Sequence, residues 1–281
     1  MPTFTRGTVT SGPVPLAYLD SGGDGSPVVF LHGAMGRGAC WAKVMTALAP
    51  HHRCIALDQR GHGRSGKPQH AYQREDFVAD LQHAVNALGL TRFALIGHST
   101  GALNAWVYAA RHPERVAALV IEDMHATGRG PSEVESWRNW LQSWPLPFPT
   151  KLDATAHFAR LRPSLADYFA ELFEEREDGW WPVFSNQTII ETIEANEARD
   201  WWNELAAVAC PTLVVKGGDS DYLLQAEAER MASTLRQGRL AVVPGANHTV
   251  HVDQPEAYVE TVAEFLAEAL GERRPAPSSL P

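Results

Sequence analysis

The sequence predicts an α/β fold, in which a mostly parallel, doubly wound sheet carries a helical cap insertion. Short apolar runs recur without alternation, as expected of strands that a parallel sheet buries on both faces. Stretches of helical length separate these runs, which favours crossover helices on both faces of the sheet. This alternation stops at residue 128 and resumes near residue 200, and the segment between is rich in proline and tryptophan. We therefore expect one core domain with an insertion over the sheet.

The individual elements follow from local patterns. Residues 4–10 and 14–20 alternate around Ser11-Gly12-Pro13, which predicts a β-hairpin. The strands expected after it are 28–31, 54–57, 93–97, 116–121, 212–215 and 240–243. The expected helices cover about 40–48, 75–88, 102–110, 224–235 and 255–270.

These elements divide the chain into regions. Residues 1–127 and 201–270 are expected to form the core, and 128–200 the helical cap. The tail, residues 271–281, is rich in Pro and Ser, and we expect it to be disordered.

Composition excludes several classes of partner. The net charge is −9 with scattered acidic residues, which argues against nucleic acid and anionic membrane surfaces as partners. No apolar run approaches the roughly 18 residues of a membrane span. Cys40, Cys54 and Cys210 lie far apart, so reduced, buried thiols are expected. We expect a cytoplasmic protein, and the sequence leaves its oligomeric state open.

The segment Gly97-His98-Ser99-Thr100-Gly101 lies where an expected strand turns into an expected helix. In this context G-x-S-x-G predicts a nucleophilic serine on a strained turn. Side chains at positions 97 and 101 would collide with neighbouring backbone, so glycine is expected there. The serine hydroxyl then lies at a helix N-terminus, where free amides favour developing negative charge.

The segment His32-Gly33-Ala34 follows another buried strand. Acyl transfer needs two N–H donors directed at the oxyanion, one after the serine and one from a neighbouring strand end. The backbone amides of Ala34 and Thr100 are the candidates.

His248 is the expected base because it follows the last buried strand, on the side of the sheet where ligands bind. His251 competes with it. The His-x-x-His spacing of His248 and His251 also occurs in metal sites. Two histidines without a nearby third ligand are weak support for zinc, and no metal is expected.

The acid that orients the base is expected at a strand end. Asp221 is the first choice and Asp219 the second, both after the strand 212–215. Asp123, beside Glu122 after the strand 116–121, is a further possibility.

The loop 61–68 imitates two nucleotide-binding motifs. It matches G-x-G-x-x-G, but Pro68 follows and no helix opens there to hold a pyrophosphate. The P-loop match fails because Pro68 has no hydroxyl for Mg²⁺. A structural turn is the better interpretation, and no cofactor is expected.

With serine, acid and histidine in this order, the chain resembles the α/β-hydrolase fold superfamily, in its group of cap-bearing serine esterases and related hydrolases. The resemblance covers residues 14–270 and depends on five segments: His32-Gly33, 58–65, 97–101, 217–221 and 244–248. It implies that the acid is the last Asp of 217–221, which supports Asp221, and that 58–66 is structural. It also implies a glycine before the histidine; Asn247 stands there, which allows a changed loop or an extra polar contact to the site.

The expected cap carries an aromatic helical face with Trp137, Trp140 and Trp144. These side chains either hold a small cap together or line an apolar acyl pocket over Ser99. The residues assigned to the pocket are His32, Met35, Met124, His125, Trp137 and Trp140.

The residues together predict a serine hydrolase that cleaves an ester, thioester or lactone of an apolar acyl group, its small-molecule partner. The alternative is a carbon–carbon bond hydrolase, acyltransferase or cyclase with the same triad, and a third is a non-catalytic ligand-binding protein. Haloalkane dehalogenases and epoxide hydrolases of this superfamily carry an aspartate nucleophile, so Ser99 disfavours them.

Overall fold

An eight-stranded sheet forms the centre of the protein in the computed structural model, which describes residues 3–10, 12–160 and 165–272. The strand order is β1-β2-β4-β3-β5-β6-β9-β10. The hairpin of β1 and β2 joins the sheet antiparallel, and all pairs from β4 to β10 are parallel. The bounds are Thr5–Val9 (β1), Leu16–Asp20 (β2), Ser26–Leu31 (β3), His52–Leu57 (β4), Phe93–His98 (β5), Val116–Glu122 (β6), Thr212–Gly217 (β9) and Gly238–Val243 (β10). The predicted α/β class with a mostly parallel sheet is confirmed.

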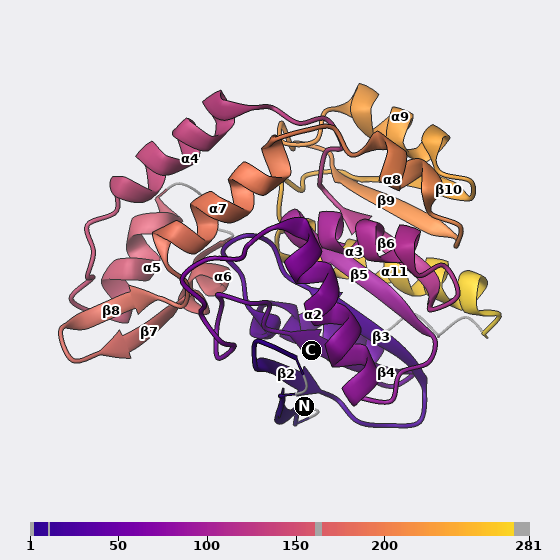
Figure 1. Cartoon of the computed structure of the whole chain (residues 1–281), viewed down its shortest axis with the longest axis horizontal. Coiled ribbons are helices and arrows are strands. Elements are labelled where there is room, and N and C mark those ends of the chain that lie inside the picture. The colour runs from indigo at the N-terminus through magenta and orange to yellow at the C-terminus, as the bar shows by residue number, and fades with distance from the viewer. Residues whose placement is uncertain (1–2, 11, 161–164, 273–281) are drawn as a thin grey trace.

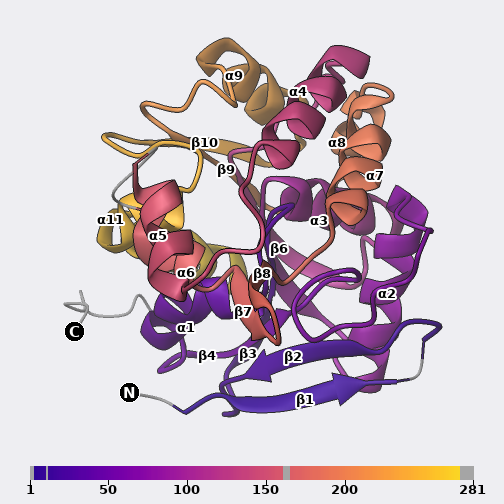
Figure 2. The same cartoon turned by 90° about the vertical axis from the view of Figure 1, so that its left-hand side faces the viewer.

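Helices cover both faces of this sheet (Figure 1). One buried cluster joins the sheet to α2, α3, α8 and α9, and a second joins its other face to α1 and α11. The bounds are Gly38–Trp41 (η1), Ala42–Leu48 (α1), Arg74–Ala87 (α2), Thr100–Arg111 (α3), Trp202–Ala207 (α8), Gln225–Thr234 (α9), Val250–Asp253 (α10) and Pro255–Leu270 (α11). The β1–β2 hairpin lies at the edge of the sheet opposite β10 (Figure 2).

The segment between β6 and α8, which is called the cap below, lies on one side of the core (Figure 1, left). Its elements are Pro131–Gln142 (α4), Lys151–Ala159 (α5), Ala166–Ala170 (α6), Phe173–Arg176 (β7), Gly179–Pro182 (β8) and Asn186–Glu197 (α7). The expectation of a purely helical insertion needs one correction, because β7 and β8 form an antiparallel hairpin. Its two-residue turn is Glu177-Asp178, and Gly179, the first residue of β8, has a φ of 137°.

Other expectations concern the termini and the cysteines. The three cysteines are free thiols, Cys54 and Cys210 buried and Cys40 half-buried. No helix within the described ranges is long and apolar enough to cross a membrane. Helix α11 ends at Leu270 with Gly271 as its C-cap, and the expected disordered tail from residue 273 lies outside the described residues.

Candidate active site

Ser99 occupies a strained turn between β5 and α3. Its φ of 52° and ψ of −127° lie outside the regions that a serine usually adopts. A Cβ at Gly97 would lie 2.5 Å from Ala102 Cα, and one at Gly101 would lie 2.5 Å from Leu31 O. Backbone packing therefore requires glycine at both positions, for the reason that the motif suggested.

The two expected oxyanion amides both lie near Ser99. Ala34 lines the same pocket as Ser99, and Thr100 is the first residue of α3. Neither amide donates a hydrogen bond to another group in the described part of the chain. Both are available to a ligand oxygen.

The loop 58–66 supports this arrangement. The Asp58 carboxylate accepts hydrogen bonds from the amides of Gly38 at 2.7 Å and Arg64 at 2.8 Å. The His62 ring contacts Ala34 O through Nε2. The loop thus folds on its own backbone and holds the segment that carries the Ala34 amide.

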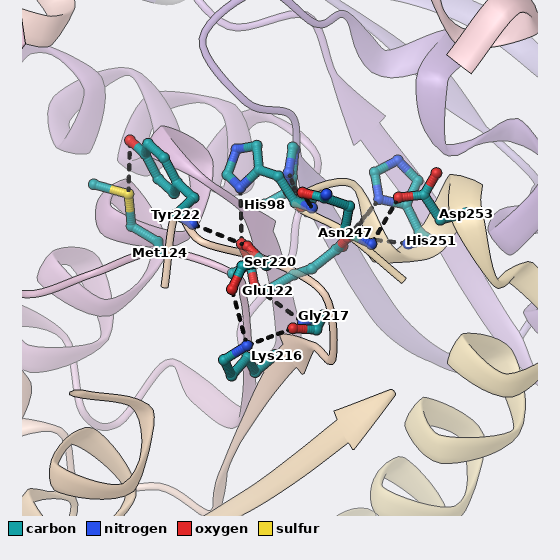
Figure 3. A network of polar contacts seen from close by, with 12 residues as sticks. His98, Glu122, Met124, Lys216, Gly217, Ser220, Tyr222, Asn247, His251 and Asp253 are labelled. Atoms are coloured by element: carbon teal, nitrogen blue, oxygen red, sulfur yellow. Dashed lines mark hydrogen bonds and ion pairs between the residues drawn. The ribbon is translucent and has the colours of Figure 1, made fainter. Parts of the chain in front are cut away.

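His248 has a buried carboxylate as its partner. Its Nδ1 lies 2.9 Å from Asp123 Oδ2, and Asp123 is fully buried at the carboxyl end of β6. The same carboxylate accepts hydrogen bonds from Gly217 N at 3.0 Å and from Ser220 Oγ at 2.6 Å. Lys216, whose ammonium donates to the carbonyls of Gly217 and Ser220, holds this turn together (Figure 3).

This geometry corrects the expectation for Asp221. Asp221 and Asp219 are both exposed at the turn after β9. The neighbours Ser220 and Tyr222 face the site, so the side chain between them faces solvent. Asp123, the third candidate, makes the contact expected of Asp221.

His251 belongs to a separate buried pair. Its Nδ1 lies 2.8 Å from Glu122 Oε1, and its ring stacks on Trp41 at 4.2 Å. Burial acts to raise the pKa of Glu122, but the rings of His251 and His98 and the hydrogen bonds from His251 outweigh it and hold this pKa below its usual value. The two histidines of His-x-x-His therefore contact different carboxylates.

Two side chains fix the backbone around His248. Burial lowers the pKa of His98 to about 3, so its ring is neutral, and its Nε2 donates to His248 O at 3.0 Å. Asn247 Oδ1 accepts a hydrogen bond from His248 N at 2.7 Å, while Asn247 N donates to Asp253 (Figure 3). Asn247, which stands where the resemblance implied glycine, thus organises the loop that presents His248.

A pocket of about 350 Å³ opens over Ser99 and His248. Its described lining residues are Gly33, Ala34, Met35, His98, Ser99, Trp137, Trp140, Leu165, Tyr168, Phe169, His248 and Thr249. This lining contains no Asp, Glu, Lys or Arg. No hydrogen bond joins Ser99 Oγ to His248 within the described ranges, and such contacts often close only when substrate binds.

Some of the residues predicted to line the pocket do so in the structure, and others do not. Met35, Trp137 and Trp140 line it, whereas Trp144 is buried among cap aromatics, 4.7 Å from Phe158. The three remaining assignments are wrong because these side chains are held elsewhere. His32 is buried against the Gln59 amide at 2.9 Å, Met124 belongs to the core cluster, and His125 is fixed by the Thr127 carbonyl at 2.8 Å.

Sequence reasoning missed two groups near Ser99. Leu165, which precedes α6, and Tyr168 and Phe169 within α6 complete the pocket. The Tyr222 ring packs against His248 with centroids 4.2 Å apart. The carboxyl end of β9 indicated the neighbourhood of Tyr222, but no local pattern distinguished it from Asp221.

Comparisons with known proteins agree with this architecture. The model of the family described as the alpha/beta hydrolase fold matches residues 26–255. Epoxide hydrolase 1 of Caenorhabditis elegans is 27% identical over 275 residues, 90% of this chain and 68% of that protein. The 2-(acetamidomethylene)succinate hydrolase of Mesorhizobium japonicum is 29% identical over 252 residues, 87% of this chain and 89% of that protein. A crystal structure of E-2-(acetamidomethylene)succinate hydrolase superposes with a TM-score of 0.86 at 26% identity, covering 94% of this chain and 99% of that one. The chain belongs to the α/β-hydrolase fold family and to its hydrolase enzymes.

Proposed function

We propose that the protein is a serine hydrolase that cleaves a carboxylic ester, thioester or lactone through an acyl-enzyme on Ser99. The observation that carries the proposal is the 2.9 Å contact between His248 Nδ1 and the fully buried Asp123 carboxylate, beside a strained serine. A buried carboxylate in this position fixes the imidazole and stabilises its cationic form.

The proposed reaction assigns one role to each group. His248 Nε2 takes the proton of the Ser99 hydroxyl as Oγ attacks the carbonyl carbon. The amides of Ala34 and Thr100 bind the oxyanion of the tetrahedral intermediate. The protonated His248 then gives its proton to the leaving group, and a water activated by His248 releases the acyl group. Asp123, rather than Asp221, serves as the acid.

The lining of the pocket supports a neutral, apolar substrate. Trp137, Trp140 and Phe169 offer aromatic surface, and no cationic side chain among the described lining residues could pair with a substrate carboxylate. The name of the similar 2-(acetamidomethylene)succinate hydrolase indicates a dicarboxylate substrate. In this pocket such a substrate would lose its hydration without gaining an ion pair from the described lining residues. We therefore propose an uncharged acyl group for this chain, despite its similarity to those enzymes.

Two alternatives use the same residues. A carbon–carbon bond hydrolase or acyltransferase needs the same nucleophile and oxyanion amides, and would leave simple esters untouched. Epoxide hydrolysis by this chain is disfavoured, because a neutral serine replaces the aspartate expected of such enzymes.

The test is Ser99→Ala, assayed with p-nitrophenyl butyrate and with a p-nitrophenyl ester whose acyl chain ends in a carboxylate. We expect kcat to fall about 10⁶-fold for the first substrate, as for loss of a triad nucleophile. The matched control is Ser136→Ala, an exposed serine of α4 that should retain full activity. A fluorophosphonate should add to Ser99 of the wild type and not to Ser99→Ala. Near-normal turnover by Ser99→Ala would overturn the proposed function, and faster turnover of the charged ester would overturn the substrate class.

A further inference from the structure

A second cavity lies beside the pocket over Ser99. Its volume is about 560 Å³, compared with about 350 Å³ for the pocket over Ser99. Apolar residues supply part of its wall, namely Phe4, Leu19, Ala42 and Val252. The exposed side chains of Arg6 and Lys43 lie where this cavity meets solvent. The second cavity is therefore an apolar hollow with a charged outer end, and the proposed reaction does not use it.

Tyr168 is the one described residue that lines both cavities. Its ring is buried, and it packs edge-on against the ring of His251 with centroids 6.3 Å apart. His251 also lines the second cavity, and its own ring is held by the contacts with Glu122 and Trp41 described above. The Tyr168 ring thus forms a wall between the two cavities.

The cap helix that carries Tyr168 is fastened to the core and to the rest of the cap. Glu171, the C-cap residue of α6, forms an ion pair with Arg37 at 2.5 Å, just before η1. Phe169 stacks on Phe158 of α5 with centroids 4.2 Å apart. The second cavity lies between the end of α6 and the start of α1, which are neighbours in Figure 2. These contacts restrict how far the Tyr168 ring can move away from its position between the cavities.

We propose that Tyr168 is a specificity-determining residue, whose ring closes the pocket over Ser99 and restricts the enzyme to short acyl groups. A longer chain must displace this buried ring or leave apolar surface in water, and both are unfavourable. Without the ring, the two cavities join into a space near the upper end of the range for ligand pockets, roughly 300–1,000 Å³. An uncharged chain then extends along the apolar wall of the second cavity. This inference rests on the proposed function, which places the acyl group in the pocket over Ser99.

The test is Tyr168→Ala, assayed as the ratio of kcat/KM for p-nitrophenyl dodecanoate to that for p-nitrophenyl butyrate. Both values come from one preparation, so the ratio does not depend on the fraction of folded enzyme. We expect the wild type to favour butyrate. Each methylene group that is newly buried corresponds to roughly a fourfold gain. Burial of two or three such groups should raise the ratio about 10- to 60-fold in Tyr168→Ala. The matched variant Tyr168→Phe keeps the ring and should keep the wild-type ratio.

A second substitution tests whether the chain occupies the second cavity. Ala42 lines that cavity and does not line the pocket over Ser99, so Ala42→Trp fills the cavity from the side of α1. In the Tyr168→Ala background, Ala42→Trp should return the ratio to within about threefold of the wild-type value. If Tyr168→Ala yields too little folded enzyme, Tyr168→Leu removes the ring with a smaller loss of volume and should raise the ratio in the same direction.

Three outcomes would overturn the role of Tyr168. They are a wild type that favours dodecanoate, a ratio that stays constant when the ring is removed, and a raised ratio that Ala42→Trp leaves in place. The proposed function is tested separately by Ser99→Ala. If Ser99→Ala is inactive, the proposed function survives each of these outcomes; if Ser99→Ala is active, both proposals fail.

Discussion

Replacing Asp123 by asparagine tests which carboxylate orients His248. Asparagine has nearly the same size, and it tolerates the φ of 45° at this position better than most residues do. Its carbonyl oxygen can still accept from Gly217 N, so the turn after β9 keeps one of its hydrogen bonds. The change removes the negative charge and places an amide near His248 Nδ1.

The structure sets the expected size of the effect. Asp123 is fully buried and lies 2.9 Å from Nδ1, so the solvent around the protein does not screen its charge. An asparagine NH₂ group that faces Nδ1 favours the His248 tautomer whose proton is on Nε2. A protonated Nε2 cannot accept the Ser99 proton. In serine proteases the same exchange lowers kcat by about 10⁴. We expect a fall of 10³- to 10⁴-fold here, or about 4–5 kcal/mol of transition-state stabilisation.

The assay is p-nitrophenyl ester turnover at pH 7.5, with Asp221→Asn as the matched control. Asp221 is exposed, so its variant should keep kcat within about twofold, as surface substitutions usually do. Thermal unfolding of both variants checks that any loss is not due to misfolding. The reasoning would be refuted by an Asp123→Asn enzyme with more than a tenth of wild-type kcat, or by a larger loss in Asp221→Asn.

Two further predictions concern stability. Burial raises the pKa of Glu197 to about 7, and its Oε1 lies 3.5 Å from His125 Nε2. Because the folded-state pKa is above the unfolded value, the protonated carboxyl stabilises the fold fully below pH 4.5. This stabilisation is lost as the pH rises through 7. The free energy of unfolding of Glu197→Gln minus that of the wild type should therefore rise by about 3 kcal/mol from pH 4.5 to pH 8, as measured by urea unfolding at both pH values. The same difference at both pH values would contradict the raised pKa of Glu197. Gly97→Ala should destabilise the protein by about 3 kcal/mol or more, because its Cβ meets backbone at 2.5 Å. Gly89 has a φ of 69°, but no atom lies within 4 Å of where a Cβ would be, so Gly89→Ala should lower the free energy of unfolding by only about 1 kcal/mol. If urea unfolding showed the same loss of stability for both variants, packing would not be the cause.

Local patterns sufficed for the parts of this protein that depend on local geometry. The apolar runs of β3 to β6 and β9 identified a parallel sheet, because burial on both faces leaves no room for alternation. The elbow at Ser99 was predictable because a strand–turn–helix of that length admits only glycine at 97 and 101. The cap hairpin was missed, because β7 and β8 are only four residues long and no Asn-Gly or Asp-Gly pair occupies their turn.

The partners of the site depended on contacts between segments far apart in sequence. Asp123 and Asp221 both follow buried strands, and only the pairing of β6 with β9 decides which of them faces His248. The same holds for Tyr222, whose ring packs against that of His248 with centroids 4.2 Å apart. The sequence by itself determined the fold class and the strained turn at Ser99, since both follow from short-range sterics and burial. The tertiary structure alone decided which carboxylate contacts His248 and which side chains line the pocket, because both depend on the direction of a side chain across the sheet.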